Sequence, residues 1–183
     1  SEAARRLCLN VLQLSEHQHE LLNQFTREIV AWNEKINLVS RKDCDASTVF
    51  GRHVLPSLCA PRRLFSGRVI DVGTGGGFPG LPLAIRHPEV TFVLADSVGK
   101  KVNVVASIAK DLGLSNVDTF HGRVEDYVGH FDVVMGRSVT ALPQFCAYTH
   151  HLLKPSGRLV YWIGGDIDKN IMQLCSESIS ISE

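Results

Sequence analysis

The feature that most constrains this chain is a glycine-rich turn that follows a short apolar strand pattern. The segment reads Val69-Ile-Asp-Val-Gly-Thr-Gly-Gly-Gly-Phe-Pro-Gly80, and an apolar helical pattern comes directly after it. Glycine permits sharp backbone turns and close approach to a bound ligand, so alternate glycines after a strand are typical of a ligand-binding loop. The segment therefore predicts a strand–loop–helix unit with its ligand at the carboxyl end of the strand.

Strand and helix patterns alternate along the chain from residue 68 onward. The expected strands are 68–72, 91–95, 117–121, 131–136 and 158–163. The expected helices are about 79–87, 98–112, 141–153 and 166–176. Such alternation predicts right-handed crossovers and an α/β fold with a parallel sheet.

The first third of the chain has a different pattern. Ser15-Glu-His-Gln18 reads as a capping box, and apolar residues follow at helical spacing from Leu21 to Ile36. Residues 1–60 are therefore expected to form a helical N-terminal cap, and residues 61–183 the ligand-binding α/β core. A length of 183 residues with 44% hydrophobic content fits a single domain with a sizeable core.

The composition limits the classes of partner. Nineteen basic residues balance nineteen acidic ones, so a nucleic acid would have to bind a local patch rather than bulk charge. No apolar run reaches the length of a membrane span, and the printed N-terminus has no signal-peptide pattern. Five irregularly spaced cysteines predict free thiols in a reducing compartment, and the histidines lack a metal-binding motif, so no metal site is expected.

The glycine spacing separates two kinds of cofactor. Counted from Gly73, the dinucleotide pattern G-x-G-x-x-G fails because Phe78 replaces its third glycine. Counted from Gly75 the pattern recurs, but it then begins farther beyond the end of the strand than it does in dinucleotide-binding proteins. Pro79 at the start of the helix has no N–H to offer a phosphate. S-adenosylmethionine (SAM) has no phosphate, and its cationic groups suit Asp71, either by direct contact or through a loop that Asp71 fixes. The spacing therefore favours SAM over NAD.

Two further features follow at the intervals expected of this architecture. Asp96 ends the second strand, where a carboxylate can accept hydrogen bonds from ribose hydroxyls, or can instead cap the next helix. Val124-Glu125 follows the third strand, where the backbone of a methyltransferase reads the edge of adenine. The pattern of residues 152–160 predicts a helix end, a turn and a strand. This pattern is typical of SAM methyltransferases before their fifth strand.

Together these residues resemble one family, the RsmG (GidB) methyltransferases of small-subunit ribosomal RNA. The resemblance covers about residues 15–165 and is most specific in Trp32-Asn33-Glu-Lys-Ile-Asn37-Leu38 and in the Gly-Phe-Pro-Gly form of the loop. It implies a class I, Rossmann-like SAM-dependent methyltransferase sheet with an N-terminal helical extension. It also implies transfer of a methyl group from SAM to N7 of a guanine in the 530 loop of 16S-type rRNA.

The resemblance and the motifs above assign the site residues. Guanine N7 carries a lone pair and no proton, so no catalytic base is needed, and Arg137 and His53 are expected to position the reactants. Contacts to RNA are expected from Asn37, Arg52 and His53. Arg137 could instead form a structural ion pair, and Trp162 reads as core rather than a base-stacking platform. The expected cofactor-binding residues are Asp71, Gly73, Gly75, Gly77, Phe78, Asp96, Val124, Glu125 and Arg137.

Three departures from the family pattern affect the residues expected to contact the methyl acceptor. Pro56 stands where a carboxylate is usual, and Gly136-Arg137-Ser138 where Ser-Arg-Ala is usual. Ile163 stands where a lysine could contact a phosphate. These departures keep two alternatives open: a non-catalytic SAM-fold module on ribosomes, and a SAM methyltransferase of small molecules. An NAD-type oxidoreductase is disfavoured by the glycine spacing.

The last expectations concern the C-terminal strands, the partner and the compartment. This fold usually ends in two more strands, and only 179–181 could begin one, so truncated C-terminal strands and an exposed edge beside strand 158–163 are expected. The expected partner is small-subunit rRNA or an assembly intermediate of that subunit, with no membrane. A monomer is expected by default, and the resemblance implies the bacterial cytoplasm, with the plastid stroma as the alternative.

Overall fold

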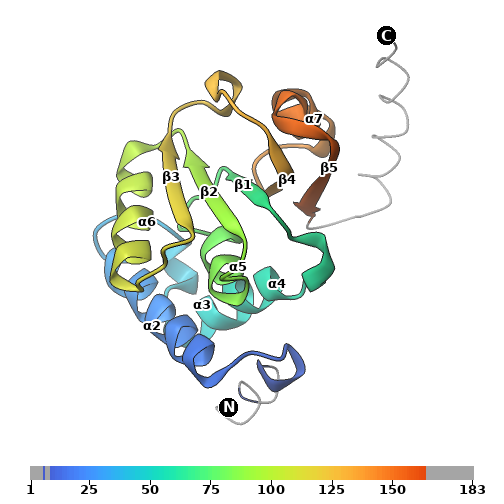
Figure 1. Cartoon of the computed structure of the whole chain (residues 1–183). Coiled ribbons are helices and arrows are strands. Elements are labelled where there is room, and N and C mark those ends of the chain that lie inside the picture. Colours follow the sequence, from blue (N-terminus) through green and yellow to red (C-terminus); the bar gives the residue numbers. More distant parts are fainter. Residues whose placement is uncertain (1–5, 7–8, 164–183) are drawn as a thin grey trace.

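The computed structural model describes residue 6 and residues 9–163, which form a parallel sheet with helices on both faces (Figure 1). The strand order is β3-β2-β1-β4-β5. The strands are β1 (Arg68–Val72), β2 (Thr91–Asp96), β3 (Val117–His121), β4 (Phe131–Arg137) and β5 (Leu153–Trp162). The predicted α/β fold is confirmed, and the first four strands agree with their predicted ranges to within one residue.

The three inner strands form because their side chains are apolar on both faces. β1, β2 and β4 are buried along nearly their whole length, as expected of parallel strands covered by helices on both sides. β1 lies at the centre, where Ile70 is paired with Val93 of β2 and with Val134 of β4. The chain runs from β1 to β2 on one side, while β4 lies on the other, so a crevice is expected between these loops at the carboxyl ends.

β5 begins earlier than the sequence predicts. The pattern before Arg158 predicts a helix end and a turn, but the chain joins the sheet at Leu153, which pairs with Phe131 before the register shifts through a bulge. Lys154 contributes to this early entry, because its Nζ lies 2.9 Å from each carboxylate oxygen of Asp132 on β4. This contact across the sheet accompanies the early pairing, and the local turn pattern does not contain it.

The first cap helix begins where the sequence predicts. The Ser15 hydroxyl accepts a hydrogen bond from the Gln18 N–H, and the Gln18 side-chain carbonyl accepts one from the Ser15 N–H, which completes the capping box. A π-helical turn, η2 (Phe50–Val54), joins two short helices into one stretch. The cap helices are α2 (Glu16–Asn33), α3 (Ala46–Val49) and α4 (Leu55–Leu58).

The core helices follow the predicted alternation with one shortening. They are α5 (Gly80–Arg86), α6 (Gly99–Asp111) and α7 (Leu142–Thr149). The prediction of one helix over 141–153 is too long, because α7 is followed by a 3-10 turn, η5 (His150–Leu152), before β5. The predicted helix 166–176 and the possible strand start at 179–181 lie outside the described residues.

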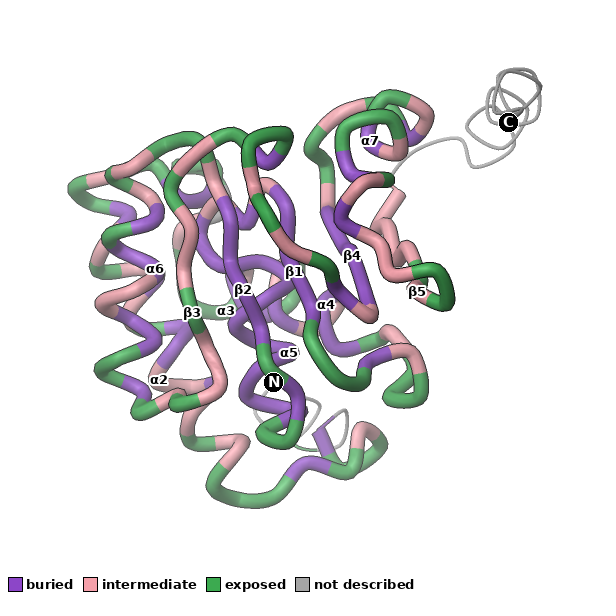
Figure 2. Tube along the Cα trace, turned by 45° about the horizontal axis from the view of Figure 1, so that its top comes forward, coloured by how far each residue is buried: buried purple, intermediate pink, exposed green. Residues whose placement is uncertain are grey.

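Two hydrophobic clusters cover the two faces of the sheet. The cap helices, α5 and α6 share the larger cluster with one face, and α7 shares the smaller one with the other face. Figure 2 shows the buried residues concentrated along the inner strands and on the sides of the helices that face them. The cap therefore extends the layer formed by α5 and α6, and its helices approach the carboxyl ends of the strands from that side.

Arg86 connects α5 to the cap. Its side chain is only 6% exposed, and its Nη1 donates to the carbonyl oxygens of Leu58 at 2.5 Å and Ala60 at 3.1 Å. Burial lowers the pKa of this guanidinium from its ordinary value. The two carbonyls offset part of the desolvation of the charge, so α4 and α5 are joined by a buried polar contact.

The described residues also bear on membrane, thiol and metal features. Among the described helices none is both long and apolar enough to cross a bilayer. The cysteines in this part, Cys44, Cys59 and Cys146, are free thiols. Residues 9–163 hold no group of three or more His, Cys, Asp or Glu side chains arranged to hold a metal ion.

Candidate active site at the carboxyl ends of the strands

Asp71 holds the glycine loop in shape from inside the protein. Its side chain is fully buried, and its Oδ2 accepts hydrogen bonds from the Thr74 hydroxyl at 2.7 Å and the Gly80 N–H at 2.9 Å. Burial raises the pKa of the Asp71 carboxyl from 3.8 to about 6, against these two hydrogen bonds, which lower it. Of the two roles that the sequence left open for Asp71, the contacts match fixing the loop.

The glycines of the loop serve different purposes. Gly77 has a φ of +88°, and a Cβ there would lie 2.5 Å from Leu81 Cδ1, so this glycine allows the loop to pack on α5. Gly75 has a φ of +57°, and a Cβ there would meet only one atom within 4 Å, the Gly73 carbonyl oxygen at 4.0 Å. The absence of a side chain at Gly75 therefore leaves open space in front of the loop.

The first of two cavities, which we call the β2 cavity, has a volume of about 200 Å³ and lies beyond the end of β2. Asp96 lies in its wall, where Oδ2 accepts from the Gly75 N–H and Oδ1 from the Val98 N–H, each at 2.9 Å. A carboxylate offers about four lone-pair sites, so two hydrogen bonds leave capacity for a ligand. The predicted residues Val124 and Glu125 line the same cavity.

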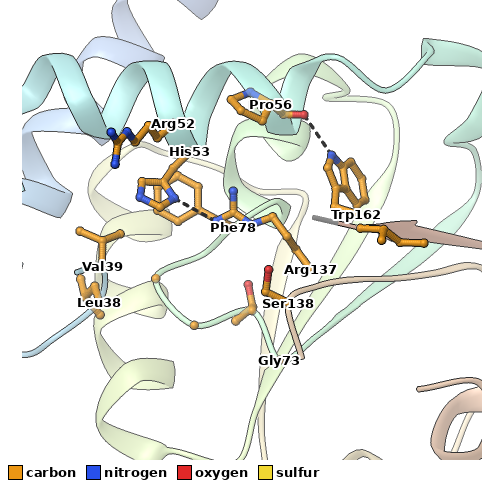
Figure 3. A pocket seen from close by; sticks show the side chains of 14 residues that line it. Leu38, Val39, Arg52, His53, Pro56, Gly73, Phe78, Arg137, Ser138 and Trp162 are labelled. Carbon is orange, nitrogen blue, oxygen red and sulfur yellow. Dashed lines mark hydrogen bonds between the residues drawn. The ribbon is translucent and has the colours of Figure 1, made fainter. Parts of the chain in front are cut away.

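The second cavity, which we call the cap cavity, has a volume of about 450 Å³ and lies between the cap and the ends of β1, β4 and β5 (Figure 3). Arg52 and His53 approach it from η2, and Arg137 from the end of β4. The Arg137 guanidinium lies over the Phe78 ring at 5.2 Å, and the His53 ring lies 5.3 Å from the same ring. The cavity thus has a cationic side built around an aromatic floor.

Arg137 and His53 also contact each other directly. Arg137 Nη2 lies 3.3 Å from His53 Nδ1 (Figure 3). A guanidinium can only donate, so Nδ1 accepts this hydrogen bond and a neutral His53 carries its proton on Nε2. Burial lowers the pKa of the Arg137 guanidinium, while the Asp71 carboxylate opposes that shift.

The apolar wall of the cap cavity comes partly from residues that sequence reasoning missed. Leu38 and Val39 line it, and the buried side chain of Asn33 holds them in place. The Asn33 Oδ1 accepts from the Leu38 N–H at 2.7 Å and the Val39 N–H at 2.9 Å. The Trp-Asn…Asn-Leu pattern contains both Asn33 and Leu38. The sequence instead predicts a role for Asn37, which is exposed and does not line the cavity.

The departures from the family pattern gather around the cap cavity. Pro56, Ser138 and Ile163 all line it, beside Trp162. The Trp162 Nε1–H donates to the Pro56 carbonyl at 3.0 Å, so the backbone at Pro56 has a partner on β5 (Figure 3). Trp162 therefore contributes to the cavity wall as well as packing against the core, which the sequence prediction of a core residue did not include.

The remaining departure, glycine at position 136, is explained by the packing of Phe145. A Cβ at Gly136 would lie 2.6 Å from Phe145 Cε2, which is closer than real Cβ contacts come. Phe145 is buried, lines the β2 cavity and packs against the ring of Tyr161 at 4.6 Å between centroids. Glycine at 136 therefore makes room for an aromatic pair behind the site.

The two cavities meet at Gly73, which alone among the described residues lines both. A Cβ on Gly73 would lie 2.8 Å from Val139 Cγ2, so the side chain of Val139 lies directly against this glycine. Val139 follows β4 and is 41% exposed. The boundary between the two cavities is therefore formed by Gly73 and Val139.

The structure brings most of the predicted site residues together and leaves three outside. Arg52, His53, Gly73, Gly75, Phe78 and Arg137 line the cap cavity, and Gly73, Asp96, Val124 and Glu125 line the β2 cavity. Asp71, Gly77 and Asn37 line neither: the first two support the loop from behind, and Asn37 is exposed. The sequence predicts the strand ends correctly but not the direction of each side chain.

Comparison with solved structures shows the fold. The chain superimposes on the S-adenosylmethionine-dependent methyltransferase SibL in its apo form with a TM-score of 0.57 at 19% identity, over 73% of this chain and 42% of that one. It also superimposes on the mitomycin 7-O-methyltransferase MmcR with a TM-score of 0.55 at 12% identity, over 71% and 41% of the two chains. At these identities the likeness concerns the arrangement of the sheet and helices.

Comparison of sequences shows the family. Residues 18–182 match the model of the GidB family, described as rRNA small subunit methyltransferase G. The chain is 46% identical over 164 residues to the ribosomal RNA small subunit methyltransferase G of Chlorobium limicola, covering 87% of this chain and 74% of that protein. The relative of the same name from Porphyromonas gingivalis is 39% identical over 178 residues, covering 91% and 79%. The chain therefore belongs to the rRNA small subunit methyltransferase G (GidB) family.

Proposed function

We propose that this chain transfers the methyl group of SAM to N7 of a guanine in the 530 loop of small-subunit rRNA. The observation that carries the proposal is the pair of cavities that meet at Gly73, one beside Asp96 and the other lined by arginines. The relatives that the chain resembles are named as methyltransferases of small-subunit ribosomal RNA. SAM supplies an electrophilic methyl group, and the protein supplies the binding and alignment of two reactants.

The residues of the β2 cavity fit the nucleoside part of SAM. Asp96 retains acceptor capacity beyond its two backbone hydrogen bonds, which suits the two hydroxyls of a ribose. Val124 and Glu125 lie in the same wall and suit the adenine. Gly75 lies on the cap-cavity side of Gly73, and the open space in front of it suits the amino-acid part of a cofactor that extends from the β2 cavity past Gly73.

The cap cavity fits an acceptor that reacts without losing a proton. The described residues that line this cavity include Arg52, His53 and Arg137 but no carboxylate. Guanine N7 carries a lone pair and no hydrogen, so the enzyme has no proton to remove before the methyl group is transferred. An arginine is the most common protein partner of the guanine O6 edge, and phosphates of the RNA backbone also bind arginine.

The remaining expectations concern organisation and location. We propose that the cap, residues 1–60, and the core, residues 61–183, form a single domain, because both contribute to the larger hydrophobic cluster and to the cap cavity. We also propose that the protein is a monomer that acts in the bacterial cytoplasm on rRNA or on an assembly intermediate of the small subunit. The bacterial sources of its relatives support the compartment.

The proposal is tested with SAM that carries a labelled methyl group. The protein is incubated with small ribosomal subunits and, separately, with deproteinised small-subunit rRNA, both from cells that lack the native enzyme. We expect label in rRNA, and digestion to nucleosides should identify it as 7-methylguanosine. Label in another nucleoside would overturn the N7 assignment. SAM binding without any label in RNA would favour the non-catalytic alternative.

A matched pair of variants locates the RNA-dependent part of the site. Arg52→Ala removes an arginine that lines the cap cavity, whereas Arg41→Ala removes an exposed arginine that lines neither cavity. We expect Arg52→Ala to raise the KM for rRNA at least about tenfold, in line with the loss of a charged contact. Arg41→Ala should change it less than about threefold, and equal effects would argue for bulk charge instead.

A further inference from the structure

The hydroxyl of Tyr161 holds the segment that follows β4. Its Oη accepts hydrogen bonds from the Val139 N–H at 3.0 Å and the Thr140 N–H at 3.2 Å. It also donates to the Thr140 carbonyl oxygen at 2.7 Å. A tyrosine hydroxyl can donate once, and here it also accepts twice, so all of its hydrogen bonds go to this one segment.

The segment that Tyr161 holds forms part of both cavities. Ser138 lines the cap cavity and has a φ of +53°, a left-handed conformation that is uncommon for a serine. Val139 lines the β2 cavity and lies against Gly73, where the two cavities meet. A residue held in a sparsely populated conformation needs support from its surroundings, and the Tyr161 hydroxyl supplies hydrogen bonds to the next two residues.

The ring of Tyr161 is fixed by the sheet. Tyr161 is paired with Gly136 in the parallel ladder of β4 and β5, and its ring packs against Phe145. The position of the hydroxyl is therefore set by the backbone of β5 and by α7. Side-chain hydrogen bonds extend from the held segment along α7, from Thr140 to Gln144 and from Gln144 to Tyr148, which lines the β2 cavity.

We propose that Tyr161 is a positioning residue for methyl transfer. Its hydroxyl fixes residues 138–140, and this segment sets the distance and direction between a cofactor in the β2 cavity and an acceptor in the cap cavity. The inference rests on the proposed function, because it assigns these two occupants to the two cavities. Reacting atoms must be held within a few tenths of an ångström of their productive arrangement, so a displaced Val139 would lower the rate of transfer more than the binding of either reactant.

The test is Tyr161→Phe, which keeps the ring and removes only the hydroxyl. The matched control is Tyr127→Phe, because the Tyr127 hydroxyl accepts from Arg68 Nη2 at 3.1 Å and Tyr127 lines neither cavity. We expect kcat to fall about 10- to 100-fold in Tyr161→Phe, the size of effect known for small misplacements of reacting groups. The KM for rRNA and the affinity for S-adenosylhomocysteine, the demethylated product of SAM, should change less than about threefold.

The possible results separate this inference from the function on which it rests. If the unmodified protein transfers methyl groups and Tyr161→Phe retains kcat within about twofold, the inference is overturned and the proposed function stands. If Tyr161→Phe loses activity only in proportion to its content of folded, S-adenosylhomocysteine-binding protein, the hydroxyl is merely structural and the inference is again overturned. If the unmodified protein transfers no methyl group to any RNA, the proposed function and the inference both fall.

Discussion

Replacing Asn33 with alanine tests how the wall of the cap cavity is built. The Asn33 side chain is 5% exposed, and its Oδ1 accepts from the N–H groups of Leu38 and Val39. Alanine would leave both N–H groups without this partner, and both belong to residues that are only 9% exposed. A buried polar group without a partner costs about 1–3 kcal/mol, so two of them give a loss of about 2–4 kcal/mol once some water enters.

The assay is urea unfolding followed by circular dichroism, with the free energy of unfolding taken from the midpoint and slope. Asn37→Ala is the matched control, because Asn37 lies in the same turn but is exposed, and its Oδ1 accepts only a 3.3 Å hydrogen bond from Arg41. We expect the control to change stability by less than about 0.5 kcal/mol. A loss below about 0.5 kcal/mol for Asn33→Ala would refute the reasoning, since it would mean that water or the relaxed turn replaces both hydrogen bonds.

The same variant separates the two cavities. Leu38 and Val39 line the cap cavity and not the β2 cavity, so Asn33→Ala should raise the KM for rRNA at temperatures where the variant is still folded. The affinity for S-adenosylhomocysteine, measured by calorimetry, should stay within about threefold of the unmodified protein. A large loss of cofactor affinity in folded protein would contradict the assignment of the cavities.

Three further substitutions test the loop and the core beneath it. Gly75→Val should lower the affinity for S-adenosylhomocysteine at least about tenfold, because the new side chain fills the open space in front of the loop. The domain should stay folded, because the side chain meets no close neighbour and the left-handed backbone costs only about 1–2 kcal/mol. Calorimetry and urea unfolding measure the two effects, and unchanged affinity would count against the role of the loop. Gly136→Ala should cost about 1–3 kcal/mol in urea unfolding, because its Cβ would strike Phe145, and a neutral result would mean that Phe145 can move aside. Asp71→Asn should change the dependence of stability on pH. The folded-state pKa of Asp71 is raised to about 6, so the folded chain retains a proton that the unfolded chain releases near pH 3.8, and stability falls as pH rises between these values. Relative to the unmodified protein, the asparagine variant should therefore gain up to about 3 kcal/mol between pH 4 and pH 7, and parallel pH profiles would contradict a raised pKa.

The sequence predicts the inner sheet well because the inner strands are apolar on both faces. The runs that became β1, β2 and β4 have few alternative placements, and the loop after β1 follows from its glycines. The start of β5 could not be predicted in this way, because Leu153 pairs with Phe131 before a bulge, and Lys154 meets Asp132 across the sheet. Local patterns do not contain that contact.

The candidate site is predictable to the level of strand ends. Asp96 and Arg137 close their strands, and parallel strands place both at the same edge of the sheet. The direction of a side chain is a different matter, since Asp71 lies two residues before the loop yet faces the interior. The walls formed by Leu38 and Trp162 come from opposite ends of the chain, and only the folded arrangement reveals that they share a cavity.

The buried guanidinium of Arg86 has a consequence for how the protein opens. If the cap moved away from the core, the carbonyls of Leu58 and Ala60 would leave with it, and a charge buried beneath the sheet would lose its partners. A hydrogen bond to a charged group contributes about 1.5–3 kcal/mol, so this contact adds measurably to the free energy of opening the cap. Amide hydrogen exchange in α4 should therefore be slower than expected for so short a helix, because releasing the cap breaks this contact.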